Sequence, residues 1–209
     1  PRGPYLLAGY SGGGVVAFEM AQQLKAQCEE VPLLVFFDTY HPQMPLRAVS
    51  YSRRLSRLRK EGLRYVKELA RDRLERARAV HERLQIKLCL LRGGPVPHAL
   101  RDRQLTESFG RAAAHYRPQP WQGKAILFRA ESVPFVFSGG GPDYGWDSVV
   151  LGGVKTVMIP GNHATLLLGP NAKVLMGPLN AALDEANLGT AMRPTPFTQE
   201  CSGSTKASA

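Results

Sequence analysis

The chain has 209 residues, of which 44% are hydrophobic and 21% charged, values typical of a globular domain with its own core. No apolar run approaches the ~18–20 residues of a membrane-spanning helix, so we expect no membrane segment. The start, Pro1-Arg2-Gly3, lacks an initiator methionine and an apolar secretory segment, so we expect a piece of a longer protein. Cys28, Cys89 and Cys201 form neither a disulfide framework nor a C-x-x-C metal pattern, which favours a reducing, cytoplasmic setting.

The net charge of +10 is concentrated in the middle of the chain. Residues 47–117 contain 19 Lys/Arg and 7 Asp/Glu, a net charge of +12, whereas the remaining residues contain 8 and 10, a net charge of −2. Aromatic residues are few in this segment and it resembles no nucleic-acid-binding module, so we expect no nucleic-acid partner. It is either a solvated, arginine-rich helical surface or a docking surface for an acidic partner.

A strand is predicted at residues 4–8, and a helix at 14–27. Between them lies Gly9-Tyr10-Ser11-Gly12-Gly13. A G-x-S-x-G sequence between a strand and a helix is typical of a nucleophile elbow, which holds a serine clear of the sheet in a strained backbone conformation. We expect glycines at 9 and 13 because a Cβ there would collide with the neighbouring strand and helix. The positive end of the helix dipole would face Ser11.

The apolar run at 31–37 predicts a strand buried on both faces of a parallel sheet, and it ends at Asp38. Leucines and arginines recur at helical spacing over 51–92, and another helix is expected at 103–116. Further strands are expected at 124–130 and 154–160, followed by a closing helix over 171–185.

Strands that alternate with helices predict an α/β fold, a parallel sheet flanked by helices. The basic helices interrupt this pattern as an insertion at about 42–118. We therefore expect one domain over 1–186, with that insertion, and a disordered polar tail over 187–209.

Three polar residues follow the ends of predicted strands: Ser11, Asp38 and His163. Because the carboxyl ends of parallel strands meet at one edge of a sheet, these side chains should lie together. A histidine can take the serine proton, a carboxylate can orient the histidine, and the serine can then attack an acyl carbon. Their order along the chain is that of α/β-hydrolases. Glu131 and Asp143, after the third strand, are alternative acids.

Several stretches resemble the thioesterase domains of non-ribosomal peptide and polyketide synthases and the related fatty-acid thioesterases. They are Pro4–Ala21, Leu34–Thr39, Leu127–Ala130, Gly145-Trp146 and Ile159–Leu167. The resemblance implies an α/β-hydrolase fold in which Ser11 is the nucleophile, Asp38 the acid and His163 the base. It implies that the insertion is the family's variable lid.

The resemblance also implies the substrate: an acyl, polyketide or peptidyl chain delivered on the phosphopantetheine arm of a carrier domain in the same polypeptide. The chain would pass to Ser11 and leave by hydrolysis or cyclisation, without a cofactor or metal. Gly12 would supply an oxyanion N–H, and Tyr10 and Tyr40 would contact the substrate.

The family has strands before the elbow that this sequence lacks, so we expect an amino-terminally truncated domain with one oxyanion donor missing. Two other functions remain open. One is an esterase or acyltransferase acting on small free esters. The other is a non-catalytic α/β-hydrolase fragment that serves as an interaction module.

Overall fold

The computed structural model describes residues 3–45, 51–134 and 137–191, and the chain divides into two compact units. The sheet unit is formed by Pro1–Pro45 and Arg117–Ala209, and the helical unit by Leu46–Tyr116. Across the described ranges, no helix combines the length and the apolar character needed to cross a membrane.

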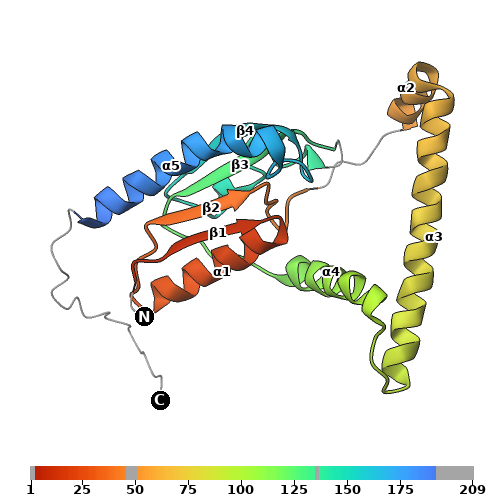
Figure 1. The fold of residues 1–209 in the computed structure, drawn as a ribbon, viewed down its shortest axis with the longest axis horizontal. Helices are drawn as coiled ribbons and strands as arrows, with labels where there is room; N and C mark the ends of the chain where they lie inside the picture. The colour runs from red at the N-terminus through yellow and green to blue at the C-terminus, as the bar shows by residue number, and fades with distance from the viewer. Residues whose placement is uncertain (1–2, 46–50, 135–136, 192–209) are drawn as a thin grey trace, which may run out of the picture. The chain divides into compact units, whose positions relative to one another are not determined.

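The sheet unit is built on four parallel strands in the order β1-β2-β3-β4 (Figure 1). The strands are Leu6–Tyr10, Leu33–Phe37, Ala125–Ser132 and Val154–Asn162, and the helices of this unit are α1, Gly12–Ala26, and α5, Gly169–Ala191. A short 3-10 turn, Trp146–Ser148, follows β3. The expected parallel sheet flanked by helices is therefore confirmed.

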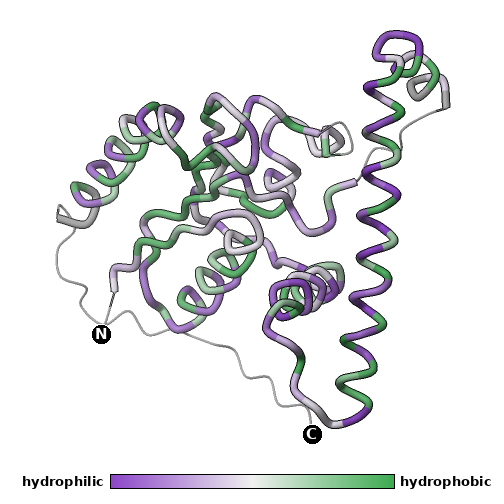
Figure 2. The backbone as a smooth tube through the Cα atoms, turned by 45° about the vertical axis from the view of Figure 1, so that its right-hand side comes forward, coloured by the Kyte–Doolittle hydropathy of each residue, from purple (hydrophilic) through white to green (hydrophobic). Residues whose placement is uncertain are grey.

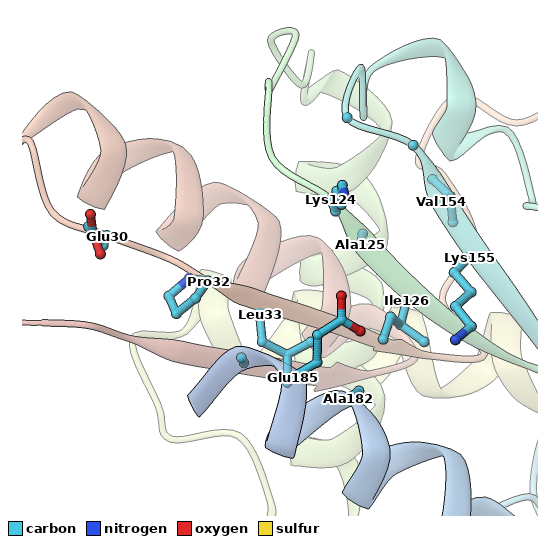
Figure 3. A pocket seen from close by; sticks show the side chains of 13 residues that line it. Glu30, Pro32, Leu33, Lys124, Ala125, Ile126, Val154, Lys155, Ala182 and Glu185 are labelled. Carbon is cyan, nitrogen blue, oxygen red and sulfur yellow. The ribbon is translucent and has the colours of Figure 1, made fainter. Parts of the chain in front are cut away.

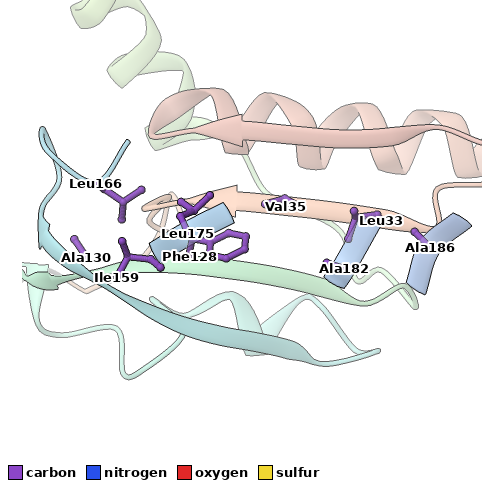
Figure 4. Close-up of a cluster of buried hydrophobic side chains, with 9 residues drawn as sticks. All are labelled: Leu33, Val35, Phe128, Ala130, Ile159, Leu166, Leu175, Ala182 and Ala186. Carbon is purple, nitrogen blue, oxygen red and sulfur yellow. The ribbon is translucent and has the colours of Figure 1, made fainter. Parts of the chain in front are cut away.

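The two faces of the sheet carry separate apolar layers because successive side chains of a strand point to opposite faces. On one face, Phe18 of α1 packs against Phe36 and Trp146, with ring centroids 6.4 and 5.0 Å away. On the other face, Leu33 and Val35 meet the apolar side of α5 (Figure 4). Strand β2 is thus buried on both sides, as its continuous apolar run predicts.

Several element boundaries differ from the predicted ones. Strand β1 runs to Tyr10 rather than residue 8, because the backbone stays extended in register with β2 until the elbow. Helix α4 begins at His98, directly after Pro97, five residues earlier than expected. Helix α5 continues to Ala191, so residues 187–191 of the expected tail are helical; residues 192–209 lie outside the described part of the chain.

The expectation for the elbow glycines is correct at Gly9 and wrong at Gly13. A Cβ on Gly9 would overlap the backbone of Gly13 and Gly14, whereas a Cβ on Gly13 would meet nothing within 4 Å. The second close approach is at Gly14, where a Cβ would overlap the side chain of Thr39. Since Thr39 follows Asp38, this contact sets how closely α1 approaches the segment that carries the acid.

The helical unit consists of α2, Tyr51–Glu61, α3, Leu63–Leu91, and α4, His98–His115. The segment 51–92 is helical as predicted, and it is divided into α2 and α3 at Gly62, whose φ is 49°. Hydrophilic and hydrophobic residues alternate along α3 (Figure 2). Arg57 makes two hydrogen bonds to Glu61, at 2.9 and 2.8 Å, and its guanidinium lies 4.6 Å from the ring centroid of Tyr65. The lid role of this unit stays a prediction.

Of the cysteines in the described part of the chain, Cys89 is a free thiol. The reducing setting that the cysteine pattern favours stays a prediction.

The two elbow glycines that follow Gly12 allow a matched test of packing. We expect Gly14→Ala to lower the free energy of unfolding by about 1–3 kcal/mol, because the added methyl overlaps Thr39. Gly13→Ala, in the same turn of α1 but facing open space, should be neutral or stabilising by up to about 1 kcal/mol. Urea unfolding of the full-length protein measures both; equal effects would contradict the packing argument.

Candidate active site

The turn between β1 and α1 holds Ser11 in a backbone conformation that residues with a side chain rarely adopt. Its φ is 53° and its ψ is −125°, which for a residue with a Cβ costs about 1–3 kcal/mol. The N–H of Ser11 donates to the carbonyl of Phe37 at 2.9 Å, which ties the turn to the end of β2. Helix α1 begins at the next residue, so its positive end lies beside the serine.

The side chains of Ser11, His163 and Asp38 form a continuous line of hydrogen bonds. His163 Nε2 lies 3.0 Å from Ser11 Oγ, and His163 Nδ1 lies 2.8 Å from Asp38 Oδ2. A carboxylate only accepts hydrogen bonds, so Nδ1 carries the proton and Nε2 is left to accept the hydroxyl of Ser11. The parallel sheet brings these residues together from the ends of β1, β2 and β4.

Asp38 is fully buried, and its carboxylate is held by donors from three parts of the chain. Oδ1 accepts the N–H of Ala130 in β3 at 2.9 Å and the hydroxyl of Tyr144 at 3.0 Å, while Oδ2 faces His163. A buried carboxylate is tolerated only when it is hydrogen-bonded in this way.

Of the three acids considered from the sequence, Asp38 is the one against His163. Glu131 is exposed near the end of β3, and Asp143 accepts a hydrogen bond from the N–H of Gly145 at 3.0 Å.

Tyr10 contacts His163 in two ways. Its hydroxyl donates to the backbone carbonyl of His163 at 2.6 Å, and the two rings are stacked with centroids 5.0 Å apart and an interplanar angle of 21°. Partial burial and the charge of Asp38 raise the pKa of Tyr10. The side chain thus braces the histidine, while 39% of the residue remains exposed. Its predicted contact with substrate stays a prediction.

Tyr40 and Gly12 also lie at this edge of the sheet. The Tyr40 ring is stacked on Phe137 at 4.7 Å and lies 6.3 Å from the ring of His163. Burial raises the pKa of its hydroxyl. Gly12 opens α1, whose first turn contains no acidic residue to oppose a developing oxyanion. Their roles in binding substrate and the oxyanion stay predictions.

Two residues of this site, Tyr144 and Arg129, were not singled out from the sequence. Tyr144 is fully buried and donates to Asp38, and the Arg129 guanidinium lies 4.4 Å from the centroid of its ring. The available signal was position: Tyr144 directly precedes Gly145-Trp146, one of the stretches that carry the family resemblance. Among the described residues, no group of three or more His, Cys, Asp or Glu is placed to hold a metal.

A cavity of about 570 Å³ lies at the opposite edge of the sheet (Figure 3). It is lined by the first residues of β2, β3 and β4 and by the last turns of α5, with Glu30 and Lys124 among its charged residues. None of the three hydrogen-bonded residues lines it, since they follow the other ends of the strands.

The sequence matches the model of the thioesterase domain family over residues 1–175. Short stretches match curated proteins. Identity is 52% over 44 residues with the non-reducing polyketide synthase atnG of an Arthrinium species, which is 21% of this chain and 2% of that protein. Identity is 54% over 43 residues with vanchrobactin synthetase VabF of Vibrio anguillarum, a stretch that covers 21% of this chain and 2% of that protein. Identity is 50% over 44 residues with thioesterase pytI of Aspergillus terreus, a stretch that covers 21% of this chain and 14% of that protein. The matched stretches are thus a small part of these proteins.

Solved structures share the fold. The NocB thioesterase domain, in a covalent complex with a fluorophosphonate nocardicin G analog, aligns with a TM-score of 0.52 at 23% identity, covering 88% of this chain and 67% of that one. A four-domain nonribosomal peptide synthetase bound to AMP and glycine aligns with a TM-score of 0.51 at 23% identity, over 94% of this chain and 15% of that one. The predicted α/β-hydrolase fold is confirmed.

The identity of the acid can be tested by the reaction of Ser11 with a fluorophosphonate. We expect Asp38→Asn to slow phosphonylation of Ser11 by about 10³–10⁴-fold, because an amide cannot hold His163 in the tautomer that accepts the serine proton. Glu131→Gln and Asp143→Asn are the matched controls and should leave the rate within about twofold of the unsubstituted protein. Peptide mass spectrometry locates the adduct; an adduct on another serine, or a control as slow as Asp38→Asn, would contradict the assignment.

Proposed function

Because the chain belongs to the thioesterase domain family, we propose that it releases an acyl, polyketide or peptidyl chain from the phosphopantetheine thioester of a carrier domain through an acyl-serine intermediate. The observation that carries this proposal is the hydrogen-bonded line from Ser11 Oγ through His163 to Asp38. We further propose that the carrier domain lies in the same polypeptide and that the setting is cytoplasmic; the multidomain synthases among the relatives support the first point.

In the acylation step, His163 Nε2 takes the hydroxyl proton while Ser11 Oγ bonds to the thioester carbonyl carbon. The negative charge moves to the carbonyl oxygen, where the N–H of Gly12 and the positive end of α1 stabilise it. The carbon–sulfur bond then breaks, and the imidazolium returns its proton to the departing thiolate. Asp38 stays ionised and holds the imidazolium through Nδ1.

In the second step, a water molecule or a hydroxyl or amine of the bound chain attacks the acyl-serine, and His163 takes its proton. The ester bond to Ser11 Oγ breaks and the serine is protonated again. Water gives hydrolysis and an internal nucleophile gives cyclisation, so the same three side chains serve both outcomes.

We expect the full-length protein to hydrolyse a small acyl thioester and to gain one acyl mass on the peptide containing Ser11. Ser11→Ala should lower kcat by about 10³-fold or more and abolish the acylated peptide, because among the described residues Ser11 Oγ is the oxygen hydrogen-bonded to His163 Nε2. Rapid quenching followed by peptide mass spectrometry measures both.

The same assay separates the two other functions. An esterase or acyltransferase would turn over the matched oxygen ester at least as fast as the thioester. A non-catalytic interaction module would form no acyl-serine at all and would bind the carrier equally well with Ser11→Ala. Either result would overturn the proposal.

We also propose that the basic segment 47–117 steers an acidic carrier domain toward the protein. The support is its net charge of +12 in a chain whose remainder is slightly acidic. Part of this charge is engaged locally, since Arg57 pairs with Glu61 and Arg83 with Glu107. Arg71, Arg73 and Arg78 of α3 are exposed and form no ion pair among the described residues, so they are suitable probes.

Reversing these three arginines to glutamate should lower kcat/KM for a carrier-bound thioester at least tenfold at low ionic strength. It should leave a small neutral thioester unaffected, because attraction beyond a Debye length of about 8–10 Å acts only on the charged partner. Steady-state assays at increasing salt measure the effect, which should disappear as salt screens the charges.

The matched control reverses three exposed lysines of the sheet unit, Lys25, Lys155 and Lys173, for the same change in net charge. In this control, kcat/KM for the carrier-bound thioester at low salt should stay close to that of the unsubstituted protein. If both triple variants behave alike, or if both substrates respond alike, the basic segment is only a solvated helical surface.

A further inference from the structure

Among the described residues, Tyr144 is the one donor to Asp38 that a substitution can remove without touching the backbone or the histidine. The other contact to Oδ1 is the backbone N–H of Ala130, at 2.9 Å, which no side-chain change removes. The Tyr144 hydroxyl reaches the same oxygen at 3.0 Å. Two donors on Oδ1 leave Oδ2 to face His163, so together they fix the rotation of the carboxylate about its last bond.

Several contacts hold Tyr144 itself in place. Its backbone is in the left-handed region, with φ 56°, and its side chain is completely buried. Its carbonyl accepts the N–H of His41 at 3.2 Å, which ties it to the segment after β2. Backbone strain of this kind persists only where the surroundings hold it in place.

Arg129 of β3 supplies much of that restraint. Its Nη1 donates to the carbonyls of Gly141 and Pro142, both at 2.8 Å, and its guanidinium lies 4.4 Å from the centroid of the Tyr144 ring. The loop before Tyr144 is therefore fastened to the strand that also provides the Ala130 N–H. Strand β3 thus positions both donors of Asp38 Oδ1, because Ala130 belongs to it and Arg129 holds the loop before Tyr144.

We propose that Tyr144 is a positioning residue of the active site, which acts through Asp38 by holding its carboxylate in the orientation that presents Oδ2 to His163. This inference rests on the proposed function of Ser11, His163 and Asp38. Burial, and next the charge of Asp38, raise the pKa of Tyr144 far above neutral pH, so its hydroxyl remains a donor throughout the working range. The other titratable or charged groups around Asp38 and Tyr144 are Tyr10, Tyr40, Arg129 and His163.

The test is Tyr144→Phe in the full-length protein, which removes the hydroxyl and keeps the ring. We expect kcat for thioester hydrolysis to fall about tenfold, the rate equivalent of one hydrogen bond to a charged group, with KM within twofold. Tyr65→Phe is the matched control: Tyr65 is also buried, but on α3, and its substitution should leave kcat unchanged. Thermal unfolding confirms that both variants are folded.

A double-mutant cycle distinguishes positioning from a general loss of structure. Tyr144→Phe alone should slow phosphonylation of Ser11 about tenfold. In an Asp38→Asn background, which keeps the side-chain shape but removes the charge, the same substitution should change that rate less than twofold. A purely structural role would give the same tenfold loss in both backgrounds and would overturn the inference.

If Tyr144→Phe is unstable, Arg129→Lys provides a second route, because it loosens the loop without removing the hydroxyl and should lower kcat by a smaller factor with KM unchanged. Unchanged kcat in Tyr144→Phe, while Ser11→Ala is inactive, would refute the role of Tyr144 and leave the proposed function intact. An active Ser11→Ala would instead refute the proposed function itself.

Discussion

The carboxylate of Asp38 is buried away from water, and the arrangement of the active-site edge of the sheet depends on this burial. A buried charge is tolerated only if donors replace its hydration, and here the donors come from β3, from the loop before Trp146 and from the residue after β4. Each of these segments is distant from Asp38 in the sequence. Satisfying one carboxylate therefore fixes the relative positions of three parts of the chain, and the histidine is one of them.

The sequence predicted the elements that depend on local pattern. The apolar run before Asp38 and the glycines around Ser11 identify the strand ends, and the parallel sheet then brings Ser11, Asp38 and His163 to one edge. What it missed depends on packing between segments far apart in the chain. The sequence does not distinguish Gly13 from Gly14, and it is the contact with Thr39 in the folded protein that shows that Gly14 must lack a side chain. Tyr144 is separated from Asp38 by 106 residues, and no spacing rule connects them.

The two units differ in what their sequences make predictable. In the sheet unit, alternation and burial define strands whose order follows from parallel pairing. In the helical unit, leucines spaced among arginines predict helices, but the interruption at Gly62 and the early start of α4 after Pro97 depend on single residues at helix ends. Charge follows the same division, since the basic excess lies within residues 47–117. Chemistry and surface charge are therefore encoded in separate stretches of the chain.

The left-handed backbone at Asp38, with φ 47°, restricts which acid can occupy this position. Asp and Asn enter this region several times more readily than other residues with a side chain, whereas Glu has no such preference. Glutamate would keep the charge but would combine backbone strain with an extra methylene in a site that is already full. Whether a substitute keeps the negative charge is therefore a poor guide to whether the fold accepts it at position 38. Asparagine, though neutral, fits the backbone there better than glutamate.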